Sequence, residues 1–221
     1  MNTIMGFDLS SPFEYENGFH LTGDNSRIGK LLAHYELYKK IIGLPGHIFE
    51  FGVHKGNSLI RFATFRELLE SSHSRKIIGF DTFDYFPETQ SNEDNKFISA
   101  FVNEAGKPIS TDELEACLQH KGITNVELVK GNILTTLPDY LAQHPETKAA
   151  LIHIDVDVYE PTKVILEKLY ERLVPGGLLL LDDYAIVAGE TRAVDEYFKD
   201  KAKIEKLPFS HRPSYIQKAN V

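Results

Sequence analysis

The 221-residue chain has 42% hydrophobic and 25% charged residues, so its length and composition suit one folded domain with a large core and a small extension. A formal net charge of −8 argues against a protein that binds the nucleic-acid backbone. No window is long and apolar enough to span a bilayer, and the amino terminus lacks the basic-then-apolar order of a signal peptide. Cytoplasmic residence, with no membrane partner, is therefore the default expectation. The single cysteine, Cys117, is expected to pack as a small apolar residue.

The first 44 residues are expected to form an arm and a packing helix, separate from a main domain over residues 45–221. Residues 1–25 are polar and turn-rich with little periodicity, which predicts an irregular arm or lid. Residues 26–42 have apolar side chains at helical spacing, which predicts an amphipathic helix closed by Gly43. The apolar face of this helix is expected to contain Leu31, Leu32, Tyr35, Tyr38 and Ile42. Because such arms often pack across a partner subunit, we expect a homo-oligomer.

The rest of the chain alternates strand-like and helix-like patterns. The apolar runs that predict strands are HIFEF, KIIGFD, NVELVK, LIHIDV, GLLLLDD, KIEKLPFS and SYIQKA. Helical patterns separate the first five runs, which indicates a doubly wound α/β sheet of seven strands that ends in a hairpin. Residues 84–107 are rich in Asn, Glu and Pro, and we expect a long loop that acts as a lid there.

The first of these strands turns through two glycines into a helix, which is typical of a nucleotide-binding element. The loop reads G-V-H-K-G from Gly52 to Gly56, with His54 where a dinucleotide fingerprint has its middle glycine, so a pyrophosphate ligand is disfavoured. Glu50, at the strand end, suits the ammonium group of an amino-acid tail. Asp81 ends the second strand, where Rossmann-like folds place an acid on ribose hydroxyls. An ordinary strand-helix turn explains the glycine pattern equally well.

Two acidic pairs follow the two most apolar strands. Asp155 and Asp157 close the first of these strands, and Asp182 and Asp183 close the second. A single acid at a strand end is commonly solvated or caps the next helix, so Asp183 alone has a structural explanation. Two pairs on neighbouring strands are harder to explain in that way, because four carboxylates at one edge need a cation or a proton.

The segment between the acidic pairs is expected to be a helix. Pro161 suits its first turn, Ile165, Leu169 and Leu173 recur at helical spacing, and Pro175-Gly176-Gly177 is expected to stop it. Because a right-handed crossover makes the two flanking strands parallel, both acidic pairs should emerge at the same carboxyl edge of the sheet, where open α/β sheets bind ligands.

Several separated segments carry a family resemblance. They are FEFGVHKGNS at 49–58, GFDTFDYFPE at 79–88, KGNILTTLP at 130–138, IDVDVYEPT with PGGLLLLDDY, and RAVDEYF at 192–198. Together they resemble the class I S-adenosylmethionine (SAM) methyltransferases, and within these the metal-dependent sugar O-methyltransferases similar to the macrocin and mycinamicin enzymes. The resemblance implies a Rossmann-like seven-stranded sheet with an antiparallel last strand.

The resemblance also implies roles for individual residues. Asp155, Asp182 and Asp183 are expected to bind a divalent cation, usually Mg²⁺, and Asp157 is expected to be the general base. The residues expected around SAM are Glu50, Gly52, Val53, Gly56, Ser58, Asp81, Thr82, Asn132 and Asp155. The acceptor is expected to be a sugar hydroxyl of a nucleotide-sugar or glycoside. The chain is shorter than expected for the macrolide-type members in the arm and in the 84–107 segment, where the acceptor would be held, so the resemblance carries the chemistry better than the substrate.

The chemistry agrees with these roles, since carboxylate oxygens suit Mg²⁺ and His or Cys ligands at zinc spacing are absent from these segments. Other readings stay open. IDVDV also matches the D-x-D pattern of a metal-dependent glycosyltransferase, although that interpretation leaves the second acidic pair and the glycine loop without a role. A phosphatase of the HAD type also uses D-x-D, but its motif normally follows the first strand, near the amino terminus. A catechol or phenol acceptor suits the same metal chemistry. A non-catalytic binding protein with this fold is a further alternative.

Overall fold

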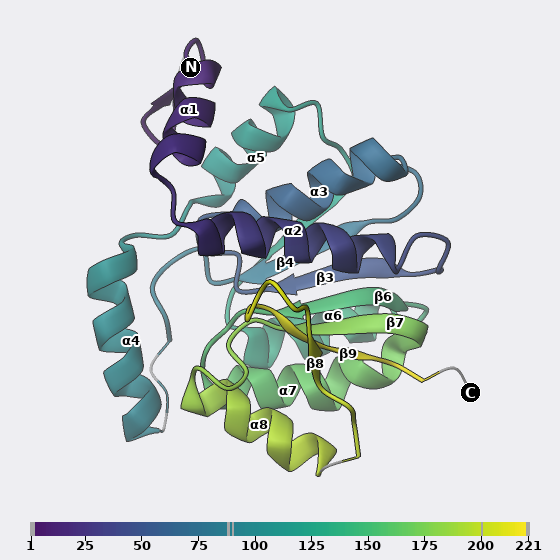
Figure 1. Cartoon of the computed structure of the whole chain (residues 1–221). Helices are drawn as coiled ribbons and strands as arrows, with labels where there is room; N and C mark the ends of the chain where they lie inside the picture. Colours follow the sequence, from purple (N-terminus) through teal and green to yellow (C-terminus); the bar gives the residue numbers. More distant parts are fainter. Residues whose placement is uncertain (1–2, 88, 90, 200, 220–221) are drawn as a thin grey trace.

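A seven-stranded sheet forms the centre of the computed structural model, which describes residues 3–87, 89, 91–199 and 201–219 (Figure 1). Its strands are β3 (His47–Phe51), β4 (Ile77–Asp81), β5 (Val126–Lys130), β6 (Ala149–Ile154), β7 (Leu173–Leu181), β8 (Glu205–Lys206) and β9 (Ser214–Gln217). They lie in the order β5-β4-β3-β6-β7-β9-β8, and β9 runs antiparallel to both of its neighbours. The predicted doubly wound sheet with an antiparallel last strand is confirmed.

Helices cover both faces of the sheet (Figure 1). On one face lie α2 (Asn25–Lys39), α3 (Asn57–Leu69) and α5 (Thr111–His120), and on the other lie α6 (Ile133–Gln143), α7 (Tyr159–Leu169) and α8 (Ala188–Phe198). Strand alternation assigns each side chain to a face. Phe49 and Phe51 belong to the core under α6–α8, so Glu50 between them faces α2 and α3. Among the helices in the described part of the chain, none is both long and apolar enough to cross a membrane.

The chain order reverses between β3 and β6, where their loops diverge. Gly52 follows β3 with a φ of +88°, and a Cβ atom there would lie 1.7 Å from the carbonyl oxygen of Asp155. Only glycine allows this approach, which brings the loop after β3 against the end of β6. The glycine predicted to contact a cofactor therefore also has a packing role.

Residues 3–25 are more regular than the sequence predicted. They form a small hairpin of β1 (Thr3–Ile4) and β2 (Phe7–Asp8), followed by α1 (Pro12–Thr22), which begins at a proline as helices often do. No residue of α1, all of which are described, is buried. A helix that presses on no core needs no apolar stripe, which is why periodicity did not reveal it. Residues 1–2 of the expected arm lie outside the described residues.

The prediction of an unstructured loop over 84–107 is wrong for most of that segment, because α4 (Asn92–Ala105) forms within it. The side chain of Ser91 caps this helix by accepting the N–H of Asp94 over 3.2 Å. Further along α4, the rings of Phe97 and Phe101 stack with their centroids 5.9 Å apart. Figure 1 shows α4 standing beside the main body of the molecule. Glu88, the last residue of one family motif, lies outside the described residues.

The expected helix stop at Pro175-Gly176-Gly177 is also wrong. Helix α7 ends at Leu169, a 3₁₀ turn follows over Tyr170–Arg172, and β7 begins at Leu173 and runs through the three residues. A Cβ atom on Gly177 would lie 2.9 Å from the carbonyl oxygen of Ala150, so glycine lets β7 pass close to β6 where their register shifts.

The predicted helix after residue 25 is confirmed, although it ends at Lys39 and its buried face is turned from the predicted one. Leu32 and Ile42 are 47% and 41% exposed. The residues buried on α2 are Ala33, His34, Leu37 and Tyr38. Because His34 is polar, a search for apolar residues at helical spacing does not find this face.

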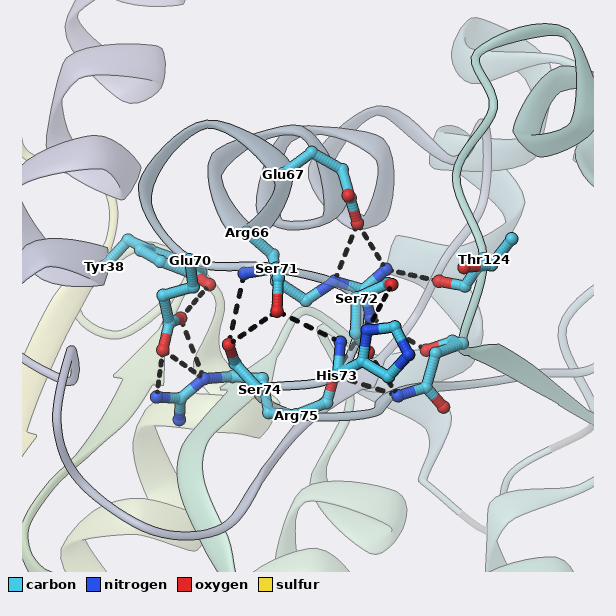
Figure 2. Close-up of polar contacts among 11 residues, drawn as sticks. Tyr38, Arg66, Glu67, Glu70, Ser71, Ser72, His73, Ser74, Arg75 and Thr124 are labelled. Carbon is cyan, nitrogen blue, oxygen red and sulfur yellow. Dashed lines mark hydrogen bonds and ion pairs between the residues drawn. The ribbon is translucent and has the colours of Figure 1, made fainter.

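An ion-pair network anchors the carboxyl end of α2 to the sheet domain (Figure 2). The guanidinium of Arg75 lies 2.7 Å from Oε1 of Glu70 and donates to the backbone carbonyls of Ile41 and Leu44, each over 3.2 Å. The hydroxyl of Tyr38 donates to the other oxygen of Glu70 over 2.5 Å. These bonds fix α2 relative to α3 and β4, which matters because α2 supplies a residue to the site described below.

Candidate functional site

A cavity of about 420 Å³ lies at the carboxyl edge of the sheet. Most of the predicted site residues line it: Gly52, Val53, Ser58, Asp81, Thr82, Asn132, Asp155, Asp157, Asp182 and Asp183. Glu50 and Gly56 are not among its lining residues. Arg27 and Lys30 of α2 and Phe101 of α4 also line it. Of the two segments expected to hold an acceptor, the 84–107 segment therefore reaches the cavity, through α4. No described residue of the arm over residues 1–25 lines it; the contribution from that end of the chain comes from α2, the predicted packing helix.

Glu50 lies directly behind the cavity wall. Its side chain is fully buried, and the hydroxyl of Ser58 donates to its Oε1 atom over 2.8 Å. Its Oε2 atom has no hydrogen-bond partner among the described residues. Because a buried carboxylate oxygen without a donor is costly, this atom is suited to a donor that arrives with a ligand or a water.

Asp81 holds two loops of the cavity wall together. Its Oδ2 atom accepts the backbone N–H of His54 over 2.9 Å, and its Oδ1 atom accepts that of Phe83 over 2.7 Å. His54 has a left-handed φ of 47°, so it takes the conformation that a dinucleotide fingerprint gives to glycine. The imidazole of His54 packs on Phe101 of α4, with ring centroids 5.4 Å apart. The loop after β3 is thereby connected to both β4 and α4.

Three carboxylates converge on the opposite side of the cavity. Asp155, Asp182 and Asp183 each offer an oxygen, and these atoms lie within 4.8 Å of one another. The predicted meeting of the two acidic pairs at one sheet edge is therefore observed. Oxygen donors of this kind suit Mg²⁺, which takes one to three carboxylates and keeps positions for water or substrate. The donor set fits a divalent cation.

Lys30 of α2 reaches this acidic group from outside the sheet. Its Nζ atom donates to Oδ2 of Asp182 over 2.7 Å and lies 3.5 Å from Oδ2 of Asp155. Burial opposes the charge of Lys30, but the two carboxylates outweigh it and hold the pKa of Lys30 above its ordinary value. Burial likewise opposes ionisation of Asp182, yet Lys30 and His153 hold the pKa of Asp182 below its usual range. Sequence reasoning missed Lys30.

Asp157 and Asp183 form a second pair of buried, neighbouring carboxyl groups. Burial and the charges of Asp155 and Asp182 raise the pKa of Asp183 to about 6, although Arg212 lies 3.3 Å from its Oδ1 atom. Burial, and then the charge of Asp183, raise the pKa of Asp157 well above its ordinary value. Asp157 also has a strained left-handed φ of 63°.

One protein family matches most of the chain. The family described as Macrocin-O-methyltransferase (TylF) matches residues 17–210. The chain belongs to this family. The match covers strands β3 to β8, both acidic pairs and every residue that lines the cavity except Arg212.

Two relatives of the chain are named O-methyltransferases. The 8-demethyl-8-(2,3-dimethoxy-alpha-L-rhamnosyl)-tetracenomycin-C 4'-O-methyltransferase of Streptomyces olivaceus is 30% identical over 153 residues, which is 66% of this chain and 56% of that protein. The mycinamicin III 3''-O-methyltransferase of Micromonospora griseorubida is 31% identical over 163 residues, or 70% of this chain and 61% of that protein. The matched region thus spans less than two thirds of either relative.

A solved structure extends the likeness to the whole fold. The apo structure of CalS11, described as a TDP-rhamnose 3'-O-methyltransferase of calicheamicin biosynthesis, superposes with a TM-score of 0.70 and 30% sequence identity. The superposition covers 95% of this chain and 87% of CalS11. The arm and the lid segment of this macrocin O-methyltransferase family member are therefore largely included in the shared fold.

Glu190 is a further residue of the site that the sequence did not indicate. Its side chain is fully buried in the first turn of α8, and its Oε1 atom accepts the backbone N–H of Asp183 over 3.0 Å. Burial and the nearby charge of Asp183 raise the pKa of Glu190 well above its ordinary value. Glu190 therefore fixes the backbone that carries the second acidic pair. It falls just before the RAVDEYF segment of the family, which is the only signal that pointed to it.

His153 is fully buried in β6. It nevertheless lies between two site residues, with Nε2 3.5 Å from Oδ1 of Asp182 and Nδ1 3.8 Å from Oε2 of Glu50. Burial opposes its charge, but the two carboxylates outweigh it and raise the pKa of His153 to about 9. His153 therefore lies between Glu50, on the side of the cavity predicted to hold the cofactor (the cofactor wall), and Asp182, on the side predicted to hold the metal (the metal wall).

Proposed function

We propose that the chain is a SAM-dependent O-methyltransferase that acts on a sugar hydroxyl with the help of a divalent cation, Mg²⁺ in the first instance. The observation that carries the proposal is the pairing, across one cavity, of a SAM-type strand-loop-helix wall with a three-carboxylate cluster. The relatives support the acceptor class, because their names place methyl transfer on rhamnosyl and mycinamicin sugars and on TDP-rhamnose.

The cofactor would lie along the ends of β3 and β4. Bound SAM supplies an electrophilic methyl group on its sulfonium. Glu50 and Ser58 provide acceptors for its ammonium group, and Asp81 provides acceptors for its ribose hydroxyls. Asn132 uses its Oδ1 atom to cap α6, accepting the N–H of Leu134 over 3.0 Å, which leaves its amide donors for a ligand in the cavity.

The acceptor hydroxyl would be activated at the acidic wall. Asp155, Asp182 and Asp183 would hold the cation, which as a Lewis acid lowers the pKa of a sugar hydroxyl that binds it. Asp157 would take the proton of that hydroxyl, a role supported by its place in the cavity lining beside the three carboxylates. Glu190 keeps the backbone of Asp183 in place during this step. In-line transfer then requires the activated oxygen to face the methyl group across the cavity.

The proposal includes two further points. One is that residues 1–44 form an arm and packing helix attached to a catalytic domain over 45–221. The other is a homo-oligomer formed through that arm. Its exposed apolar side chains support this point, since Phe7, Phe13 and Leu21 are 57%, 76% and 82% exposed. Light scattering of the wild type and of Phe13→Ser would test it, and a monomeric wild type would contradict it.

The experiment that tests the function is methyl transfer from labelled SAM to a panel of nucleotide-sugars, natural-product glycosides and catechols, with Mg²⁺ or with EDTA. We expect Mg²⁺-dependent transfer to a sugar acceptor. Calorimetry with S-adenosylhomocysteine and with a nucleotide-sugar distinguishes the proposed function from that of a glycosyltransferase, because a glycosyltransferase would bind only the nucleotide-sugar. Failure to bind S-adenosylhomocysteine would rule out the proposed function.

A further inference from the structure

The ammonium group of Lys30 contacts two of the proposed metal ligands. Its Nζ atom contacts Oδ2 of Asp182 at 2.7 Å and Oδ2 of Asp155 at 3.5 Å. The side chain of Lys30 is only 15% exposed and that of Asp182 only 2%. Little water screens this contact, so the interaction is stronger than a surface ion pair.

Asp182 offers the cavity only one oxygen. Its Oδ1 atom is buried toward His153, whose Nε2 atom lies 3.5 Å away, and the remaining Oδ2 atom is the one that Lys30 contacts. A divalent cation held by Asp182 from the cavity side must therefore use the oxygen that the ammonium group now uses. Two positive groups do not share one buried carboxylate oxygen without strong repulsion.

Lys30 is able to give up this contact without movement of its helix. The network around Arg75 and Glu70 holds the end of α2, and the buried Leu37 and Tyr38 fix its face against the sheet. The lysine side chain itself has four rotatable carbon–carbon bonds, and it already lines the cavity. A change of side-chain rotamer is sufficient to release the two carboxylates.

We propose that Lys30 is a tethered cation that stabilises Asp155 and Asp182 when no metal is bound and that competes with the divalent cation for Oδ2 of Asp182. Lys30 thereby sets the metal affinity of the site. This inference rests on the metal site of the proposed function. It gives α2, which lies outside the predicted catalytic domain, a direct part in loading the site.

The test is a Mn²⁺ titration of the metal-free protein, followed by calorimetry and by the paramagnetic signal of free Mn²⁺. Lys30→Met is expected to bind Mn²⁺ at least about tenfold more tightly than the wild type, because a buried like charge has been removed. Without metal, Lys30→Met should melt at a lower temperature than the wild type, and with saturating Mn²⁺ this difference should vanish or reverse. Lys39→Met is the matched control, because Lys39 lies on the same helix and pairs with exposed Glu36 at 2.9 Å; its affinity should equal that of the wild type.

A second measurement uses the wild type alone, in case Lys30→Met does not fold. Acetic anhydride labelling read by mass spectrometry should modify Lys30 faster in saturating Mn²⁺ than in EDTA, whereas Lys39 should be modified at the same rate in both. Equal or weaker Mn²⁺ affinity in Lys30→Met, or equal labelling of Lys30 in both buffers, would overturn the inference and leave the metal site standing. No Mn²⁺ binding by either the wild type or Lys30→Met would overturn the metal site as well.

Discussion

The Nε2 atom of His153 lies 3.5 Å from Oδ1 of Asp182, and both side chains are almost completely excluded from solvent. The other ring nitrogen of His153, Nδ1, lies 3.8 Å from Oε2 of Glu50. One imidazole therefore fixes a carboxylate of the proposed metal wall and a carboxylate of the proposed cofactor wall. This arrangement gives the core of the sheet a direct part in the geometry of the cavity.

Replacing His153 should affect both walls at once. We expect His153→Phe to leave Oδ1 of Asp182 and Oε2 of Glu50 facing an apolar ring and to lower the free energy of unfolding by about 3 kcal/mol, as measured by urea denaturation. The affinities for S-adenosylhomocysteine and for Mn²⁺ should both fall. His153→Gln keeps one N–H donor and should recover part of each loss. Loss of stability with both affinities unchanged would mean that His153 has only a packing role.

Asp182→Asn should separate the two walls. The amide keeps the shape of the side chain but loses its charge, so Mg²⁺-stimulated methyl transfer should fall by at least about a hundredfold, in line with the loss of one key group that stabilises a transition state. Binding of S-adenosylhomocysteine, measured by calorimetry, should change less than about threefold, which corresponds to about 0.7 kcal/mol. The reason is that the proposed cofactor residues lie on the other side of the cavity. Asp139→Asn, on the exposed surface of α6, is the control. Loss of both binding and transfer would show that the metal wall is misassigned.

The sequence predicted the parts of the site that come from the sheet itself. Right-handed crossover geometry was enough to bring Asp155 and Asp182 to one edge, because neighbouring parallel strands end together. It could not predict Lys30, whose helix precedes the sheet domain and whose contact with Asp182 depends on how that helix docks. A lone lysine on an amphipathic helix carries no pattern that separates it from a solvated one.

The errors in the fold have similar physical causes. The α1 segment was predicted as irregular because none of its residues is buried and its apolar residues form no continuous stripe. The α4 segment does carry apolar residues at helical spacing, at Phe97, Ile98, Phe101 and Val102, but the Asn, Glu and Pro content of residues 84–107 favours the prediction of a loop. Pro175-Gly176-Gly177 was predicted as a helix stop, since both residue types end helices more often than they enter strands. Gly177 is needed because β7 passes close to Ala150 of β6, and a contact between two strands is not visible in the local sequence.

The anchor of α2 should make stability depend on pH. Burial opposes the charge of Glu70, but hydrogen bonds from Arg75 and Tyr38 outweigh it and hold the pKa of Glu70 below its ordinary value of 4.5. A lowered carboxyl pKa contributes stability that is fully present above pH 4.5 and is lost as the pH falls through the folded-state pKa. Glu70→Gln should therefore lose about 3 kcal/mol at pH 7, and its difference from the wild type should shrink below about pH 4.5.

The matched control for this prediction is Glu67→Gln. Glu67 also accepts from a buried arginine, Arg66, at 2.9 Å, but its own side chain is 35% exposed (Figure 2). Its loss should cost less than about 1 kcal/mol. Chemical denaturation of both variants and the wild type from pH 3.5 to 8 measures the comparison. A pH-independent difference for Glu70→Gln would show that the ion pair is not what anchors α2.

Gly52→Ala should damage the site from a position that carries no functional group. Its Cβ atom would fall 1.7 Å from the carbonyl oxygen of Asp155, and alanine is strained at a φ of +88°, so the loop after β3 and the end of β6 must move apart. We expect a loss of more than about 3 kcal/mol in unfolding free energy and a matching loss of Mn²⁺ affinity, because Asp155 is displaced. Gly18→Ala is the control, since no atom lies within 4 Å of its Cβ position in α1 and alanine should stabilise that helix by up to about 1 kcal/mol. A stable Gly52→Ala protein with normal Mn²⁺ binding would mean that the approach of these two loops does not position the carboxylate.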